Sequence, residues 1–174
     1  MPTDDPLLPY VLAAREGDGI AVGALVRLTQ PAVWTVCQAL GSVGEVEDLV
    51  QETYLRALSG LDRYRAEAPV RVWLLSIARR VCADHVRKRQ RRRRLADRLA
   101  SHATASAVPG PEVVDDLLAL IDGDRREAFV LTQLVGLSYE DAAGVVGCPI
   151  GTIRSRVARA RADLLEIVAR SDAR

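Results

Sequence analysis

The stretch LSYEDAAGVVGCPIGTIRSRVARARADLL, residues 137–165, decides the fold of the C-terminal part of this chain. Ser138, followed three residues later by an aspartate, has the spacing of a capping box, so a short helix is expected over Tyr139–Val146. Gly147 then stands at the usual position of a helix-terminating glycine. A second helix is expected from Ile150 to about Val168. Two helices joined by a short turn that contains glycine are typical of a helix-turn-helix.

The second of these helices divides its side chains between two faces. The face toward the core is expected to hold Ile153, Val157, Ala160 and Leu164. The outward face holds Ser155, Ala158 and Arg159, with Thr152 and Arg154 at its sides. A short, basic, hydrogen-bonding face suits the major groove of DNA, where arginine binds guanine with two hydrogen bonds. Arg156 and Arg161 lie nearer the core and are expected to contact phosphates or acidic neighbours. An ordinary amphipathic helix with solvated arginines is the alternative.

The rest of the chain predicts an all-α protein made of two small helical domains joined by a flexible linker. Apolar residues recur at spacings of three and four, and alternation typical of strands is absent. We expect a first helical domain over residues 1–90 and a second over 113–174, which contains the helix-turn-helix. Residues 91–112 combine an arginine run with a small, polar segment that contains prolines, and they are expected to form the linker.

Composition excludes several classes of protein. The 174 residues carry a net charge of only +1 and include three cysteines and two histidines, which are spaced unlike metal ligands or a disulfide framework. We therefore expect no metal and no cofactor. No phosphate loop or other signature of catalysis is present, so an enzyme is not expected. Neither a signal peptide nor a membrane span is evident, and the expected compartment is the cytoplasm.

Charge is unevenly distributed along the chain, and this asymmetry points to nucleic acid. Ten basic residues but only two acids lie between Arg79 and Arg98. On the helix expected over residues 71–89, the residues opposite the apolar side are Ser76, Arg79, Arg80, Ala83 and Arg87. Binding to DNA phosphates is the natural use of such a face, because it releases counterions. A solvated helix end is the alternative.

An acidic helix is expected over residues 47–58. Val50, Tyr54, Ala57 and Leu58 face inward, whereas Asp48, Gln51, Glu52 and Leu55 gather on the other side. A leucine inside an acidic stripe suggests a protein partner with a basic, partly apolar surface. Single exposed leucines are common, however, so simple exposure remains the alternative.

One helix-turn-helix reads too few base pairs to find a site in a genome, so a second contact is needed. The basic helix and the acidic stripe supply two further surfaces. With these features the chain resembles the extracytoplasmic-function subfamily of bacterial sigma-70 factors. The resemblance rests on EDLVQETYLRA (residues 47–57), VWLLSIARR (72–80), LSYEDAA (137–143) and GCPIGTIRSRVARAR (147–161).

This resemblance implies a sigma factor that binds core RNA polymerase and directs promoter-specific initiation. The first domain would bind the β′ clamp helices and open the −10 element, and the second would bind the −35 element and the β flap. The implied polymerase-binding residues are Asp48, Gln51, Glu52, Leu55 and Arg56. The implied −10 residues are Arg65, Arg71, Trp73, Ser76, Arg79, Arg80 and Arg87, where residues 65–71 match a loop that captures an unpaired base. The implied −35 residues are Thr152, Arg154, Ser155, Arg156 and Arg159.

Two departures from the family pattern concern the −10 contact: Val72 stands where threonine is usual, and the loop residues 66–69 are less polar than is common. The resemblance also implies an anti-sigma partner. The main rival is an autonomous regulator that binds a palindrome as a dimer through the same helix-turn-helix. An RNA-binding or nucleic-acid-processing enzyme is the other rival, and the lack of stacking aromatics in the basic segments counts against it.

Overall fold

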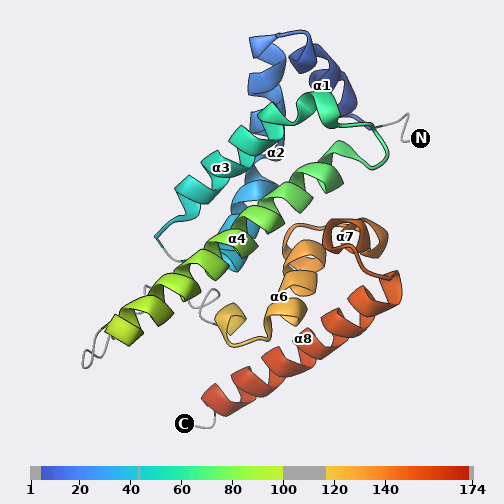
Figure 1. Cartoon of the computed structure of the whole chain (residues 1–174). Coiled ribbons are helices and arrows are strands. Elements are labelled where there is room, and N and C mark those ends of the chain that lie inside the picture. The colour runs from blue at the N-terminus through green and yellow to red at the C-terminus, as the bar shows by residue number, and fades with distance from the viewer. Residues whose placement is uncertain (1–4, 43, 100–116, 173–174) are drawn as a thin grey trace.

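The computed structural model describes residues 5–42, 44–99 and 117–172, and every regular element in these ranges is a helix. We call residues 5–99 the N-terminal body and residues 117–172 the C-terminal body (Figure 1). The N-terminal body contains α1 (Leu8–Arg15), α2 (Gly19–Leu40), α3 (Val46–Ser59), the 3-10 helix η1 (Leu61–Arg63) and α4 (Val70–Leu99). The C-terminal body contains α6 (Gly123–Phe129), the π-helix η2 (Val130–Leu134), α7 (Tyr139–Val146) and α8 (Ile150–Asp172).

Helix α2 is the central element of the N-terminal body. The Asp18 carboxylate caps it by accepting a hydrogen bond from the backbone N–H of Ile20 at 2.8 Å. By length and composition, α2 could cross a membrane, and it is the one helix in the described ranges that could. Its residues Val33 and Val36 are nevertheless 0% exposed, and the helix packs against α1, α3 and α4. We therefore interpret α2 as the core helix of a folded body.

The two bodies pack against each other through α4. Helix α7 lies across the N-terminal half of α4, whereas α2 and α3 cover the other side (Figure 1). One continuous cluster of buried apolar residues contains members of both bodies, including Leu75 and Cys82 of α4 and Leu131 of η2. At the crossing, the helices approach so closely that a Cβ built on Gly144 would lie 3.2 Å from Cγ1 of Val72.

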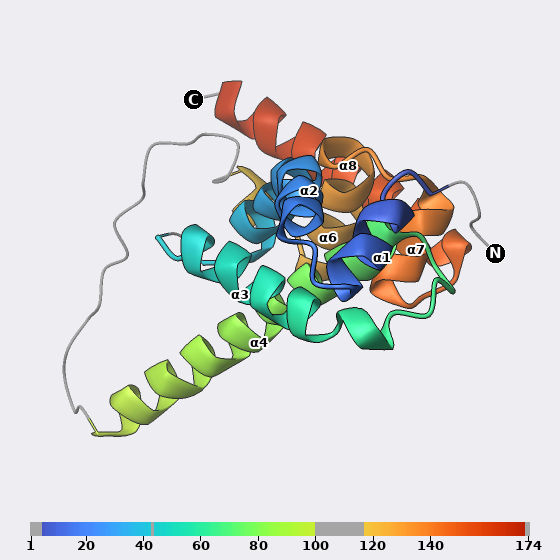
Figure 2. The ribbon, with the colours of Figure 1, turned by 90° about the horizontal axis from the view of Figure 1, so that it is seen from above.

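Two expectations about α4 were wrong. The helix continues to Leu99, so residues 91–99 are helical and do not begin a flexible linker. Arginine is a good helix former, and neither glycine nor proline interrupts this run. Figure 2 shows this end of α4 projecting away from both bodies. In addition, α4 buries two sides instead of one, because the C-terminal body covers Val72 and Leu75. The remaining linker residues, 100–112, lie outside the described residues.

Candidate nucleic-acid interface

The helix-turn-helix has the local geometry expected from the sequence. Ser138 Oγ accepts a hydrogen bond from the backbone N–H of Asp141 at 3.0 Å, so the predicted N-cap is confirmed. Gly147 ends α7 in the left-handed conformation with φ of 77°, which glycine adopts without strain. Within α7 the structure buries Ala142 and Val145 and leaves Ala143 and Val146 half-buried.

Helix α8 presents its basic face to solvent. Ile153, Val157 and Ala160 are buried, as predicted, and Leu164 is half-buried. On the opposite face, Arg154, Ser155, Ala158 and Arg159 are exposed, and Thr152 is half-buried at its edge. The small Ala158 allows the helix axis to approach a base edge, and the neighbouring guanidinium groups can reach past it.

Two arginines of α8 are held by the C-terminal body instead. Arg156 forms an ion pair with Asp124 at the start of α6. Arg161 donates a hydrogen bond to Oε1 of Gln133 at 2.7 Å. These contacts confirm that Arg156 lies beside an acidic neighbour, as its position near the core stripe suggested. They fix the orientation of α8 on the body that carries it.

The loop before α4 encloses a small pocket. Tyr64 packs against Trp73 in a tilted arrangement with ring centroids 5.0 Å apart, and its hydroxyl donates to the carbonyl oxygen of Ala68 at 2.6 Å. Together with Ser76 they line a cavity of about 240 Å³. Its wall also includes Gly144 of the other body. The half-buried Trp73 ring, the exposed Arg65 and the Ser76 hydroxyl form a site that can hold a flat, unpaired base, and the buried Tyr64 supports Trp73 from behind.

Tyr64 was missed by sequence reasoning. It directly precedes the predicted capture loop. No sequence pattern indicates whether a tyrosine at this position lines a pocket or belongs to the core. The signal that could have found it is its aromatic character, because only 4% of the residues are aromatic and two of them meet here.

Two residues of the N-terminal segment hold the loop that forms this pocket. Arg15 of α1 donates to the carbonyl oxygen of Leu61 at 2.8 Å and also to that of Tyr64. The Asp5 carboxylate accepts a hydrogen bond from the backbone N–H of Val70 at 2.6 Å, so it caps the start of α4. Both contacts fix the two ends of the loop that forms the pocket.

The basic face of α4 is only partly accessible. Arg80 and Arg87 are exposed, and Arg87 pairs with Asp84 at 2.7 Å. Arg79 points into the gap between the bodies, where it forms an ion pair with Glu127 of α6. Arg71 donates to the carbonyl oxygen of Val135 in the C-terminal body at 2.8 Å. The structure therefore brings the predicted −10 residues onto one helix and its loop, but it turns two of them toward the C-terminal body.

The acidic stripe lies on the exposed side of α3. Asp48 and Gln51 are exposed, Glu52 is half-buried, and the Leu55 side chain is 56% exposed. Arg56 binds Glu52 at 2.7 Å and Asp84 of α4 at 3.1 Å. These carboxylates raise the pKa of Arg56, and the guanidinium groups of Arg87 and Arg56 lower the pKa of Asp84. The pair with Asp84 holds Arg56 between the stripe and α4.

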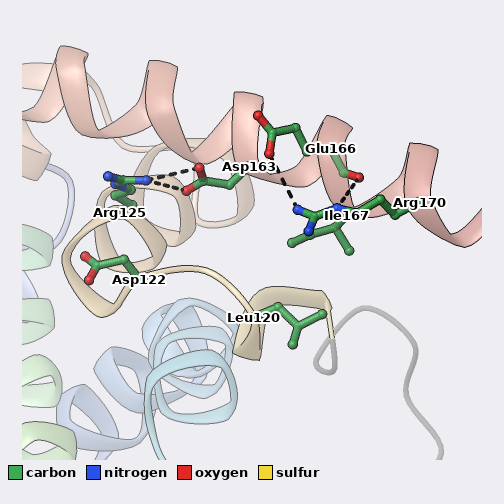
Figure 3. A pocket seen from close by; sticks show the side chains of 7 residues that line it. All are labelled: Leu120, Asp122, Arg125, Asp163, Glu166, Ile167 and Arg170. Atoms are coloured by element: carbon green, nitrogen blue, oxygen red, sulfur yellow. Dashed lines mark hydrogen bonds and ion pairs between the residues drawn. The ribbon is translucent and has the colours of Figure 1, made fainter.

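We also searched the described ranges for metal-binding groups and for further cavities. No group of three histidine, cysteine, aspartate or glutamate side chains there could hold a metal ion. A further cavity of about 660 Å³ lies at the far end of α8, where Ile167 faces Leu120 between the pairs Arg125–Asp163 and Glu166–Arg170 (Figure 3). Most residues that line this cavity are charged, and Leu120, which is 67% exposed, and Ile167 are its apolar members.

Two family profiles match the chain. Sigma-70 region 2 matches residues 25–92, and Sigma-70 region 4 matches residues 112–164. The chain is 45% identical over 168 residues to "ECF RNA polymerase sigma factor SigC" of Mycobacterium tuberculosis, covering 93% of this chain and 91% of that one. It is 40% identical over 131 residues to "ECF RNA polymerase sigma factor EcfG" of Rhodopseudomonas palustris, covering 71% of each.

Two solved structures of similar fold are both complexes with a second protein. The chain matches CnrH, solved in complex with the cytosolic domain of CnrY, with a TM-score of 0.75 and 29% identity over 95% of this chain and 98% of that one. It matches the sigma factor RpoE of Bartonella quintana, solved with the anti-sigma factor NepR, with a TM-score of 0.71 and 34% identity over 83% of this chain and 94% of that one.

The chain therefore belongs to the extracytoplasmic-function subfamily of sigma-70 RNA polymerase sigma factors. It is a transcription initiation factor that acts with core RNA polymerase at promoters, and the alternative of an autonomous dimeric regulator is not supported.

Proposed function

We propose that this sigma factor positions core RNA polymerase through three surfaces of its own chain. The exposed face of α8 reads the −35 element, the pocket and basic face of α4 read the −10 element, and the acidic stripe of α3 docks on the polymerase. The observation that carries this proposal is the face of α8, where basic and hydroxyl side chains stand exposed around Ala158.

Reading of the −35 element is assigned to Thr152, Arg154, Ser155 and Arg159. Arg154 and Arg159 are exposed and lack a hydrogen-bond or ion-pair partner among the described residues, so their guanidinium groups are available for guanine. Arg156, which is bound to Asp124, is assigned to a phosphate or to holding α8 in place.

Opening of the −10 element is assigned to the pocket lined by Trp73 and to the basic side of α4. Base unstacking costs a few kcal/mol, roughly, and stacking on aromatic side chains offsets this cost. The cationic residues Arg65, Arg71, Arg79, Arg80 and Arg87 would hold the phosphates of the separated strand. Ser76, at the pocket wall, supplies a hydroxyl for the base edge.

Docking on polymerase is assigned to Asp48, Gln51, Glu52, Leu55 and Arg56, with the β′ clamp helices as the partner. The cavity at the end of α8 is assigned to the β flap, because its exposed Leu120 can contact an apolar side chain and its charged residues can pair with polar ones. Leu120→Asp should reduce initiation while leaving the fold intact, because the side chain is mostly solvent-exposed.

The chain's part in initiation is binding and positioning, and we assign the chemistry of RNA synthesis to the polymerase. The cytoplasm, where bacterial polymerase acts, is the proposed compartment. An anti-sigma factor is the proposed regulatory partner, because the sigma factor RpoE named above was solved in complex with the anti-sigma factor NepR.

Run-off transcription with purified core polymerase tests the proposal. Adding the chain should produce promoter-dependent transcripts from a genomic DNA library, whereas core polymerase alone should not. If the chain binds a palindromic DNA tightly as a dimer and gives no transcript with core polymerase, the proposal is wrong.

A further inference from the structure

A basic cavity lies where α4 passes the end of α2 and the start of α6. Its volume is about 600 Å³, which is in the range of cavities that hold small ligands. Both acids and bases contribute to its wall, and the bases predominate. The arginines that line it are Arg79, Arg87, Arg89, Arg93 and Arg126.

The acids of the wall are already bound to arginines. Glu127 pairs with Arg79, and Asp124 pairs with Arg156 of α8, which lies outside the cavity. Neither carboxylate is therefore free to neutralise the rest of the wall. The arginines of the wall that pair with no carboxylate among the described residues are Arg89, Arg93 and Arg126.

Arg126 gives the strongest indication that the cavity takes an anion. Its Nε is enclosed and has no hydrogen-bond partner among the described residues, while Nη2 donates to the carbonyl oxygen of Ile121 at 3.2 Å. Burial lowers the pKa of this guanidinium, and the charge of Asp122 offsets only part of that effect. A cation that leaves water without a counter-ion destabilises the fold, so an anion bound beside it would be favoured.

Phosphate is the anionic group that fits this wall best. A guanidinium group is planar and binds phosphate oxygens with two parallel hydrogen bonds. The unpaired arginines come from two helices, α4 and α6, so they can hold several linked phosphate groups better than a single one. The end of α2 bounds the cavity as well, which suits a compact ligand better than a continuous strand.

We infer that this cavity binds a small anion that carries linked phosphate groups, with Arg89, Arg93 and Arg126 as the residues that hold it. The site is additional to the three surfaces that we assign to initiation. Its ligand binding can be measured without polymerase or promoter DNA. Failure of this inference would therefore leave the proposed function standing, and the reverse also holds.

Isothermal titration calorimetry of the full chain with sodium triphosphate tests the site, in about 0.15 M salt to screen non-specific attraction. One triphosphate should bind per chain. Arg126→Gln should weaken this binding about tenfold, because a charge-assisted contact with phosphate is lost. Arg125→Gln is the matched control, because it changes the net charge equally on the same helix. Arg125 pairs with Asp163 outside this cavity, so its substitution should leave the affinity unchanged.

A second matched pair on α4 decides the matter if Arg126→Gln does not fold. Arg93 lines the cavity and the adjacent Arg92 does not, and both side chains are exposed, so neither substitution disturbs the core. Arg93→Gln should weaken triphosphate binding about threefold, as expected for an exposed ionic contact. Arg92→Gln should leave it unchanged.

Titration with ATP distinguishes two sources of linked phosphates. Equal affinities for ATP and triphosphate would show that the cavity holds the phosphate groups alone. Tighter binding of ATP would show that it also holds the nucleoside, for which the amide of Gln90 and the hydroxyl of Ser42 line the wall. Both results support a site for linked phosphates.

Four results would overturn the inference. Triphosphate might give no heat of binding at all, or both members of each matched pair could lose affinity equally, which would show attraction to net charge alone. Orthophosphate that binds as tightly as triphosphate would reveal a site for any single anion. A short single-stranded oligothymidylate that binds more tightly than triphosphate, and loses the same affinity with Arg126→Gln, would assign the cavity to DNA.

Discussion

Arg79 and Arg159 carry the same side chain in two different settings. Arg79 is shielded between the bodies and bound to Glu127. Arg159 is exposed on α8 and contacts no acidic partner among the described residues. The first guanidinium must give up a carboxylate before it can bind a phosphate, whereas the second is ready to bind. We therefore expect substitutions at the two positions to act on different steps of initiation.

Arg159→Ala should reduce discrimination at the −35 element by about 1–3 kcal/mol, the usual contribution of a bidentate contact with guanine. Competition footprinting on promoters with single −35 substitutions measures this value. Arg161→Ala is the matched control, because Arg161 is bound to Gln133 and lies beside the reading face. Equal weakening on all sequences would instead make Arg159 a phosphate contact.

Asp48→Lys should abolish association with core polymerase without loss of helicity, because the side chain is exposed at the start of α3. A basic side chain in this stripe would repel a basic partner surface. Co-purification with core enzyme measures the association, and Asp62→Lys on η1 provides an exposed control. Unchanged co-purification would exclude this stripe as the docking face.

Cys148 should react with a thiol reagent well before the other two cysteines. Cys37 and Cys82 are buried, whereas Cys148 is half-exposed. The hydrogen bond with Cys37 and burial both raise the pKa of Cys82, so its thiol stays protonated and unreactive at neutral and mildly alkaline pH. Titration with a chromogenic disulfide should give one fast thiol in the native chain and three after unfolding. Two fast thiols would contradict this arrangement.

At the scale of elements, α7 is defined by signals at both of its ends. Ser138 caps its start and Gly147 ends it in a conformation that other residues adopt only with strain. Both are local features, which is why residues 139–146 could be delimited from the sequence. The end of α4 could not be delimited from the sequence, because an arginine run is compatible both with a solvated coil and with a helix.

Ser138→Ala should lower the free energy of unfolding by about 1 kcal/mol, the usual effect of losing an N-cap. The N–H of Asp141 loses its partner, and α7 begins less sharply. Urea unfolding followed by circular dichroism measures the change. Ser138→Thr, which keeps a capping oxygen, should recover most of the loss. If alanine and threonine behave alike, the cap does not contribute.

The parts of the site that could not be predicted from the sequence are those that depend on tertiary structure. The exposure of Arg154 and Arg159 follows from helical periodicity alone, and it was predicted. The pocket depends on a turn at Ala66, whose φ of 54° brings the loop back toward Trp73. The second buried side of α4 depends on residues more than fifty positions away, and an apolar stripe does not identify what covers it.

At the scale of the whole molecule, two bodies with different tasks share one apolar cluster. Residues of both bodies are buried together in it, and Val72 of α4 lies directly against Gly144 of α7. Burial of this kind couples the stability of the two bodies, because separating them exposes apolar surface to water. We therefore expect them to unfold together.

Tryptophan fluorescence and circular dichroism should give coincident unfolding curves. Both tryptophans, Trp34 and Trp73, lie in the N-terminal body, whereas circular dichroism reports the helices of both bodies. Gly144→Asp should separate the curves, because it places a charge against Val72. Gly151→Asp, which points into open space, should not. Curves that already differ in the native chain would show that the bodies unfold independently.

The hydrogen bonds from Asp5 and Arg15 have a consequence for exchanging parts between sigma factors. The family match begins at residue 25, yet the pocket to which we assign the −10 contact depends on Asp5 for the start of α4 and on Arg15 for the carbonyl oxygens of Leu61 and Tyr64. A chimaera joined at the family boundary would carry the side chains that we assign to DNA but would lack the Asp5 and Arg15 contacts that hold their loop. Promoter preference should therefore follow a transplanted segment only when the graft begins before Asp5.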